Sequence, residues 1–320
     1  MDFVKLDIVT ISCEQFRQLV TMEINCGLEP YSPQMLRECI TDMDTFALVD
    51  EGRIAGFITL HPSTRYLGGG LYIVNLNVAQ DYRRHGVATN LILSACSCFA
   101  ETHAKQQVML DVSKDNSAAR NLYQKLSFTV IDEPSGNGDT DEVMAVSMEE
   151  LLQITATMRL RLKTLTWCDA LEGIRILMNE SVAKTYMLPD LTVQSATELF
   201  HRLCGFSQQN THYIRGIYHN NQLVGLLNDT EINGGQIELG WVIHPDYHNQ
   251  GYATEVVSAA IKDLFARGYR EVTAGAFEEN KASIRVMQKC GMQLLDKTEE
   301  IDYRGKTHHC VFYAVRRDAN

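Results

Sequence analysis

The amino-acid sequence predicts an α/β (α+β) protein with two tandem domains, each a mixed, largely antiparallel sheet of about seven strands with helices on both faces. Three observations lead to this prediction. Residues 72–78 have the composition of a buried strand, and a polar turn then leads into an apolar-periodic helix after Gly86. The same strand, turn and helix return at 237–254, where Gly251 follows Gly86 by 165 residues. Residues 116–128 also recur, at 280–292, and such a repeat indicates a duplicated domain.

The first domain is expected to span residues 1–150. It begins with an alternating strand at 4–11, followed by helices that open at 12–13 and at Ser32-Pro33, because proline is favoured in the first turn. A hairpin turns at 50–52 and leads to the strand at 72–78. After the long helix come a strand at 107–112, a helix at 118–126 with capping residues at 115–117, and a closing hairpin of strands at 128–131 and 143–146.

The second domain is expected to span residues 156–320, after a partly helical connection at 147–157. An alternating strand at 158–165 comes first, and helices then begin at Asp169 and at Ser195. A hairpin turns at 219–221 and leads to the strand and helix around Gly251. A strand at 271–276, a helix after Asn280 and a final hairpin that turns at 303–306 complete the order of the first domain.

Composition and charge limit the range of functions. A formal net charge of −11 argues against a nucleic-acid partner and weakly favours a cationic substrate. No apolar run reaches the roughly 18 residues that a membrane span requires, and the first residues lack the pattern of a signal peptide. Nine scattered cysteines without a Cys-x-x-Cys pair indicate reduced thiols. We therefore expect a cytoplasmic monomer or homodimer with no nucleic-acid or membrane partner.

The two polar turns have the features of an anion site. Each places small residues and unpaired first-turn N–H groups where a helix begins, which suits a pyrophosphate. The residues concerned are Arg83, Arg84, His85, Gly86, Val87 and Ala88 in the first copy, and His248, Asn249, Gln250, Gly251, Tyr252 and Ala253 in the second.

These motifs resemble the GNAT superfamily of N-acetyltransferases, present twice. The resemblance rests on Arg-x-x-Gly-x-Ala at 83–88 and on the Asn…Leu-Tyr helix at 116–123, and the second half is similar to the branch that acetylates protein N-termini. It implies two acyl-CoA N-acyltransferase domains that use acetyl-CoA and need no metal. Main-chain groups near the ends of the central strands, at Leu76, Val78, Trp241 and Ile243, would hold the pantetheine arm and polarise the thioester. The cofactor positions also include Asn116 and Asn280, which begin the helix of the second repeated segment in each copy.

The resemblance also implies catalytic residues, and the two copies differ in them. Tyr123 stands at the general-acid and cofactor-contact position of the first copy, with a helix tyrosine packed under the sheet as the alternative. Met287 replaces it in the second copy, where Ser283 would hydrogen-bond the CoA sulfur, or would have no role. Glu238, on the central strand, is the candidate base, or an exposed strand carboxylate. The first copy has Val74 where relatives often have a glutamate, and Ser127 where glycine is usual.

The sequence therefore predicts an N-acetyltransferase that moves acetyl from acetyl-CoA to a primary amine, a small molecule or a peptide N-terminus, by direct attack in a ternary complex. Two alternatives remain open: one domain is degenerate and structural, or the protein is a non-catalytic acyl-CoA-binding sensor. His308 and His309 do not predict a metal site, because neighbours on a strand point to opposite faces. The acidic loop at 132–142 is a solvated hairpin tip or lines the amine entrance of the first domain.

Overall fold

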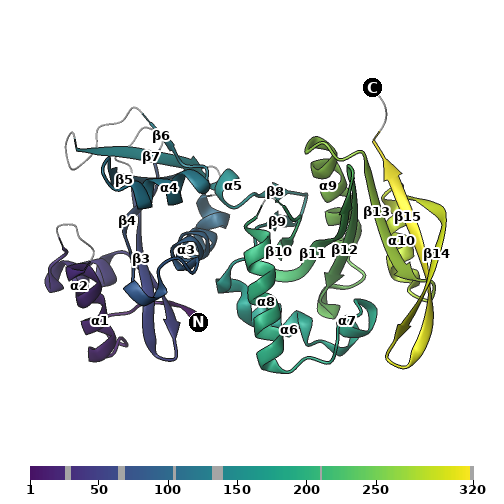
Figure 1. Ribbon diagram of the computed structural model, residues 1–320, viewed down its shortest axis with the longest axis horizontal. Helices are drawn as coiled ribbons and strands as arrows, with labels where there is room; N and C mark the ends of the chain where they lie inside the picture. The colour runs from purple at the N-terminus through teal and green to yellow at the C-terminus, as the bar shows by residue number, and fades with distance from the viewer. Residues whose placement is uncertain (26–29, 64–68, 104–105, 132–139, 210, 318–320) are drawn as a thin grey trace. The chain divides into compact units, whose positions relative to one another are not determined.

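The structure is a computed structural model that describes residues 1–25, 30–63, 69–103, 106–131, 140–209 and 211–317. The chain divides into two compact units. The N-terminal unit consists of Met1–Leu152 with Thr166–Cys168, and the C-terminal unit of Gln153–Leu165 with Asp169–Asn320. Figure 1 shows the helices and strands of both units along the chain.

The N-terminal unit is built on one seven-stranded sheet in the order β1-β2-β3-β4-β5-β7-β6. All neighbouring strands are antiparallel except β4 and β5. Its elements are, in chain order, β1 (Asp2–Lys5), α1 (Cys13–Ile24), α2 (Pro33–Asp42), β2 (Asp44–Asp50), β3 (Arg53–Ser63), β4 (Gly70–Val78), α3 (Val87–His103), β5 (Gln107–Ser113), α4 (Ser117–Lys125), β6 (Thr129–Val130), β7 (Asp141–Ser147) and α5 (Met148–Leu151).

The C-terminal unit repeats this plan in an eight-stranded sheet, ordered β8-β9-β10-β11-β12-β13-β15-β14, in which β12 and β13 are the parallel pair. Its elements are β8 (Thr155–Ala156), β9 (Arg161–Lys163), α6 (Ala170–Leu177), α7 (Glu180–Thr185), α8 (Val193–Ser207), β10 (Arg215–His219), β11 (Gln222–Asn233), β12 (Gln236–Ile243), α9 (Tyr252–Ala266), β13 (Glu271–Phe277), α10 (Lys281–Lys289), β14 (Gln293–Tyr303) and β15 (Lys306–Arg316). The predicted fold class, two mixed and mostly antiparallel sheets with helices, is confirmed.

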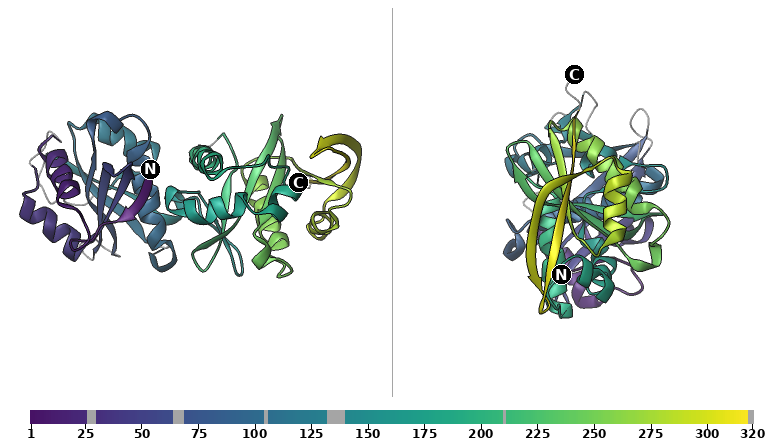
Figure 2. Two further views of the ribbon diagram at one scale, coloured as in Figure 1. Left: turned by 90° about the horizontal axis from the view of Figure 1, so that it is seen from below. Right: turned by 90° about the vertical axis from the view of Figure 1, so that its right-hand side faces the viewer.

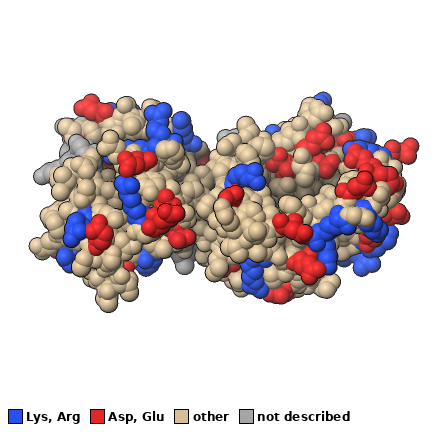
Figure 3. Space-filling model, turned by 60° about the horizontal axis from the view of Figure 1, so that its bottom comes forward, with Lys and Arg blue, Asp and Glu red and all other residues tan. Residues whose placement is uncertain are grey.

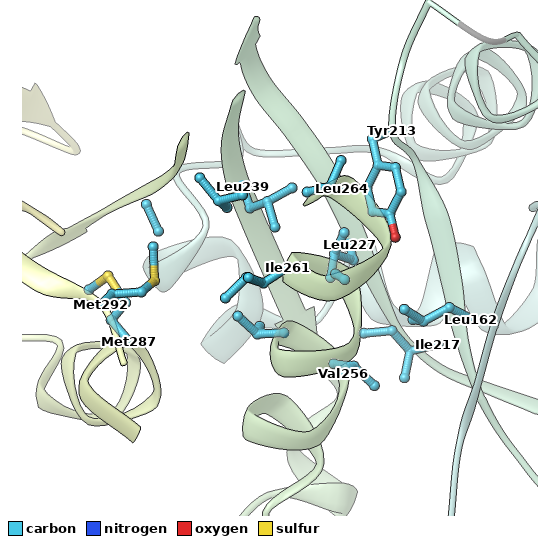
Figure 4. Close-up of a cluster of buried hydrophobic side chains, with 14 of the residues drawn as sticks. Leu162, Tyr213, Ile217, Leu227, Leu239, Val256, Ile261, Leu264, Met287 and Met292 are labelled. Atoms are coloured by element: carbon cyan, nitrogen blue, oxygen red, sulfur yellow. The ribbon is translucent and has the colours of Figure 1, made fainter. Parts of the chain in front are cut away.

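Helices cover both faces of the C-terminal sheet. In the left view of Figure 2, the teal-green α8 and the yellow-green α9 lie on opposite sides of the strands. Helix α9 turns Val256, Ile261 and Leu264 toward the sheet, where they pack with strand residues such as Leu227 and Leu239 in the main buried cluster of this unit (Figure 4). Burial of these apolar side chains stabilises the layer and holds the beginning of α9 next to the end of β12.

The parallel strands of each unit separate after a short paired stretch. Strand β4 pairs with β5 only over Gly70–Tyr72, and β12 pairs with β13 only over Gln236–Glu238. In the C-terminal unit the N–H of His244 donates to Val224 of β11. Because main-chain groups alternate in direction along a strand, those of residues 241 and 243 point to the opposite, open edge. The same alternation in the N-terminal unit, where the N–H of Ala79 donates to Ala55, directs residues 76 and 78 to the open edge of β4.

Some predicted elements differ from the observed ones. The first strands end early, at Lys5 and Lys163, instead of continuing to residues 11 and 165. Helix α8 begins earlier than predicted, because the hydroxyl of Thr192 accepts the N–H of Ser195 and Thr192 is therefore the N-cap. Helix α7 was not predicted, and Asn179 caps it through two main-chain N–H groups.

Ser127 adopts a left-handed conformation with φ +65°, and its counterpart in the second repeat, Gly291, has φ +78°. A left-handed conformation costs a residue with a Cβ atom about 1–2 kcal/mol. Glycine avoids this cost, but the greater conformational freedom of glycine in the unfolded chain offsets part of the gain. We expect Ser127→Gly to stabilise the N-terminal unit by about 0.5–1 kcal/mol, measured as a rise of roughly 1–4 °C in its melting temperature. Ser127→Ala keeps the Cβ and should give no such rise; an equal rise in both variants would contradict this explanation.

Candidate active sites

The two glycine turns have the same backbone conformation. Gly86 and Gly251 both have φ +78°, and the residues two positions earlier, Arg84 and Asn249, have φ +69° and +61°. Gly251 is the N-cap of α9 and provides no side-chain acceptor, so the first N–H groups of the helix are left for another partner. A left-handed residue at a helix N-terminus directs several main-chain N–H groups to one point, which is the geometry of an anion site.

The residue that opens each turn folds back onto the central strand. Arg83 Nε donates to the carbonyl oxygen of Val78 (3.1 Å), and His248 Nε2 lies 2.8 Å from the carbonyl oxygen of Ile243. With its proton on Nε2, the imidazole makes the same hydrogen bond as the guanidinium of the first copy. His248 is therefore a structural substitute for arginine at this position, since both side chains tie the turn to the end of the strand.

A cavity of about 360 Å³ lies beside the turn of the C-terminal unit. It is bounded by β12, by the turn, and by helices α7, α9 and α10. Most of the residues predicted for cofactor binding in this unit line it, namely Trp241, Ile243, His248, Asn249, Gly251, Tyr252, Ala253 and Asn280, together with Ser283. Gln250 is exposed and is not among the residues that line the cavity. We call this space the cofactor cavity.

Three cations at the cofactor cavity were not predicted from the sequence. Arg285 and Lys289 lie one turn apart on α10 and line the cavity. A guanidinium nitrogen of Arg159 lies 3.6 Å from where a Cβ on Gly251 would stand. Glu255 holds Arg159 by accepting its main-chain N–H and its Nε, both at 2.8 Å. The i, i+4 spacing of the first pair is a usable sequence signal, whereas Arg159 comes near the turn only through the fold.

If the ligand of this cavity is acetyl-CoA, as the sequence motifs imply, Arg285 should contribute to the binding of its phosphate groups. We expect Arg285→Ala to weaken acetyl-CoA binding about fivefold in calorimetry at low salt, because the side chain is exposed and its attraction is screened by water and ions. Lys281, on the same helix but outside the cavity lining, is the matched control. Lys281→Ala should leave the affinity unchanged, and equal losses in the two variants would show a non-specific effect of net charge.

A second cavity of about 350 Å³ adjoins the first, and we call it the acceptor cavity. The two cavities share four lining residues: Thr185, Trp241, Asn280 and Ser283. Among the described residues, the acceptor cavity is lined by three carboxylates, Glu231, Glu238 and Glu299, and by a single cation, Lys297. Figure 3 shows acidic side chains gathered at the right-hand end of that view, where the C-terminal hairpin lies. The lining charge favours a cationic ligand.

The wall of the acceptor cavity is held together by the tip of the last hairpin. The hydroxyl of Tyr303 lies 2.7 Å from the carbonyl oxygen of Ala183 and 2.6 Å from that of Leu188. Beside it, Arg304 forms an ion pair with Asp190 at 2.7 Å. These contacts fix the hairpin of β14 and β15 to the end of α7, which provides Thr185 to both cavities.

Of the two predicted catalytic residues of the C-terminal unit, Ser283 lies at the wall that the cavities share, and Glu238 lines only the acceptor cavity. Ser283 is half-buried, and its N–H donates to the side-chain oxygen of Asn280, the N-cap of α10 (3.2 Å). This cap holds Ser283 at the shared wall. Glu238 is also half-buried, lines the acceptor cavity, and accepts a hydrogen bond from the Thr230 hydroxyl at 2.8 Å.

In the N-terminal unit, Tyr123 lies on α4 with 8% of its surface exposed, and its ring packs 5.6 Å from that of Phe128. Burial raises the pKa of Tyr123 to about 12. The phenol is protonated at neutral pH, as a tyrosine with its ordinary pKa also is, and this is the form that a general acid requires. Asn116 caps the same helix by accepting the N–H of Ala119 (3.1 Å). Ala119 stands where the second copy has Ser283, so each unit carries a different candidate proton donor.

A buried carboxylate of the N-terminal unit was missed by sequence reasoning. Glu23 on α1 is 2% exposed, and its Oε1 accepts hydrogen bonds from Asn75 (2.6 Å) and Asn77 (2.7 Å) on β4. Its Oε2 accepts the main-chain N–H of Tyr31 at 3.1 Å. This unit therefore has a carboxylate against its central strand, although it comes from α1 and the strand itself carries Val74 where relatives often have a glutamate. The amide residues at 75 and 77 were the only local signal, because the partner comes from another element.

Neither a metal site nor a membrane span is found in the described part of the chain. No group of three or more His, Cys, Asp or Glu side chains there is arranged to hold a metal ion. Within the same residues no helix is both long and apolar enough to cross a membrane. Residues 132–139 of the predicted acidic loop lie outside the described residues.

Comparisons with known proteins match both units. Residues 13–128 fit the model of the acetyltransferase (GNAT) family, and residues 159–293 fit that of the acetyltransferase (GNAT) domain. N-alpha-acetyltransferase 30 of Schizosaccharomyces pombe is 29% identical over 117 residues, which cover 35% of this chain and 73% of that protein. An N-alpha-acetyltransferase of Sulfurisphaera tokodaii is 37% identical over 57 residues, 18% of this chain and 34% of that protein. A solved GNAT-family acetyltransferase from Bacillus anthracis is 22% identical with a TM-score of 0.46, covering 51% of this chain and 98% of its own.

Proposed function

Because this chain belongs to the GNAT acetyltransferase family, with two family domains in tandem, we propose that it transfers the acetyl group of acetyl-CoA to a primary amine in a ternary complex. The observation that carries this proposal is the meeting of two cavities in the C-terminal unit. One has main-chain N–H groups and cations suited to a phosphate-bearing donor, and the other has carboxylates suited to an amine. They share the wall formed by Trp241, Asn280 and Ser283.

The residues at this wall, together with Glu238 of the acceptor cavity, can serve the steps of acetyl transfer. Acetyl-CoA, when bound, supplies an activated thioester. The main-chain N–H of Trp241 points to the open edge of β12, where it can polarise the thioester carbonyl. The hydroxyl of Ser283 can donate a hydrogen bond to the leaving sulfur, and Glu238 can accept the proton of the attacking amine, directly or through a water. A direct attack by the amine needs both substrates at one place, and the shared wall provides it.

An amine acceptor is also supported by an unpaired oxygen. Within the described residues, Oδ1 of Asn228 is buried without a hydrogen-bond partner, although its Nδ2 donates to the carbonyl of Asp229 (3.0 Å). Asn228 lines the acceptor cavity, and a buried oxygen that accepts no hydrogen bond costs stability unless a ligand donates one to it. The N–H groups of an amine can donate such a hydrogen bond. Relatives named N-alpha-acetyltransferase agree with an amine acceptor, either a small molecule or a peptide N-terminus.

In the N-terminal unit, we assign the same cofactor position to the Gly86 turn and the general acid to Tyr123. The turn there has the backbone conformation of its counterpart, and the Tyr123 phenol is a protonated group on the helix that corresponds to α10. Glu23 is the carboxylate against β4 in this unit. A unit that binds acetyl-CoA without turnover, and a non-catalytic sensor, are the competing functions.

A thiol-release assay over a panel of polyamines, amino acids, aminoglycosides and peptide N-termini tests the proposal. Ser283→Ala should lower kcat about 10- to 100-fold for amines acetylated by the C-terminal unit, as expected when a hydrogen bond to a charged group is lost. Tyr123→Phe should do so only for amines acetylated by the N-terminal unit, so the pair assigns each amine to a unit. Two bound acetyl-CoA molecules per chain with no thiol release from any amine would favour the sensor.

A further inference from the structure

The acceptor cavity of the C-terminal unit already contains a primary ammonium group, which belongs to the protein. The Nζ atom of Lys297 lies 4.0 Å from the ring centroid of Phe312 and 3.1 Å from Oε1 of Glu299. Both residues line the acceptor cavity. An ammonium group over an aromatic face and beside a carboxylate occupies a position that attracts cations in general.

The surrounding charge shows that this position is built for a cation. The hydrogen bond with Glu299, and then the charges of Glu299, Glu238 and Glu231, raise the pKa of Lys297. Among the described residues that line the acceptor cavity, Lys297 is the one Lys or Arg, against three glutamates. One ammonium group does not neutralise three carboxylates, so the lining keeps a formal excess of negative charge that would repel an anionic ligand.

The segment that carries Lys297 is not held by the regular ladder. Leu294 pairs with Tyr313 and Thr298 with Val311, so residues 295–297 of β14 stand opposite a single residue of β15. The side chain of Lys297 is 47% exposed. A long, partly exposed side chain on a bulge can leave its position without breaking strand pairing, because residues of a bulge make fewer ladder hydrogen bonds.

The cavity continues past Lys297. A smaller hollow of about 140 Å³ adjoins it and shares Glu231, Glu238, Lys297 and Phe312 with it. Besides Ser283 at the cofactor wall and Lys297, the lining of the acceptor cavity includes the apolar side chains of Phe277, Ile301 and Phe312. A cavity with the shared wall at Ser283, an acidic and aromatic position at Lys297 and apolar lining residues matches a linear molecule with an ammonium group at each end.

We propose that Lys297 determines which amines the C-terminal unit accepts: its ammonium group occupies the position that the second ammonium group of a linear diamine would take. Lys297 is thus a tethered competitor of diamines and polyamines, and it has little effect on acceptors with a single amine. This inference rests on the proposed acceptor role of the cavity.

The test compares Lys297→Met, which keeps the length of the side chain and removes the charge, with Lys297→Arg, which keeps the charge. Substrates are linear α,ω-diamines of increasing length and n-alkyl monoamines of matching length. Lys297→Met should lower KM for the preferred diamine about three- to fivefold, the upper part of the range expected for one partly exposed ion pair, and should change KM for its monoamine by less than about twofold. Lys297→Arg should leave both values close to those of the wild type.

Calorimetric titration of the same diamine, in the presence of CoA and without turnover, separates this inference from the proposed function. If no amine is acetylated but the diamine binds Lys297→Met several-fold more tightly than the wild type, the transfer proposal fails and the inference stands. An unchanged diamine affinity in Lys297→Met, or an equal gain for diamine and monoamine, overturns the inference whatever the activity.

Discussion

A Glu238→Gln variant should lose about 10²- to 10⁴-fold in kcat for acetyl transfer by the C-terminal unit, the range typical of general acid–base catalysis. Glu238 lines the acceptor cavity, and its Oε1 accepts the hydrogen bond of the Thr230 hydroxyl. The glutamine oxygen still accepts that hydrogen bond, but the amide cannot take the proton that the attacking amine loses. Steady-state thiol release should therefore show a fall in kcat with an unchanged KM for acetyl-CoA.

The control for this variant is Glu300→Gln on β14. Glu300 is exposed, lies outside the lining of the acceptor cavity, and contacts Nδ1 of His309 at 2.8 Å. Its neutralisation should leave kcat within about twofold of the wild type, since exposed ion pairs contribute little. Both variants are best measured in a Tyr123→Phe background, which suppresses turnover by the N-terminal unit. If Glu238→Gln and Glu300→Gln have similar activity, Glu238 is not the base.

A Gly251→Val variant should remove one of two acetyl-CoA sites per chain, and Gly86→Val should remove the other. Both glycines have φ +78°, a conformation that costs a residue with a Cβ about 1–2 kcal/mol, and more for a β-branched one. In the C-terminal turn the new side chain would also approach the guanidinium of Arg159, which lies 3.6 Å from the Cβ position. The turn should relax to another backbone conformation and lose its converging N–H groups. Calorimetric stoichiometry measures this directly.

Two glycines at other left-handed positions provide matched controls. Gly268 has φ +99° and Gly52 has φ +83°, and neither has an atom within 4 Å of its Cβ position. Gly268→Val and Gly52→Val should carry a similar backbone cost and lower thermal stability, yet keep both acetyl-CoA sites. If either control also loses a site, general destabilisation explains the result and the turns have no special role. If Gly251→Val keeps two sites, the C-terminal turn does not hold the phosphates.

Local features of the fold were predictable because neighbouring residues decide them. The chain turns at Gly86 and Gly251 need a left-handed residue, and the asparagines at 116 and 280 cap their helices with their own side chains. The repeat of these signals at nearly constant spacing was enough to predict two similar sheets. The boundaries of β1 and β9 were predicted less well, because alternation continues in the sequence beyond the point where strand pairing ends.

The functional positions that the sequence did not reveal depend on contacts between distant segments. Glu23 meets Asn75 across 52 residues, and Tyr303 reaches the end of α7 across 120 residues. Nothing in the local pattern of either residue distinguishes it from an ordinary helix glutamate or hairpin tyrosine. Sequence reasoning named Ser283 and Glu238 as candidates, but whether they lie at a common cavity depends on how α10 and β12 pack.

The sequence by itself determined the duplication, the fold class and the two turns suited to a diphosphate, since these follow from local backbone preferences and from a pattern repeated along one chain. Only the tertiary structure decided that the cofactor and acceptor cavities share a wall, that Glu23 lies against β4, and that Lys297 sits over Phe312 among carboxylates. The reason is physical: a cavity and its charge are properties of surfaces that meet after folding, and side chains far apart in sequence contribute to them.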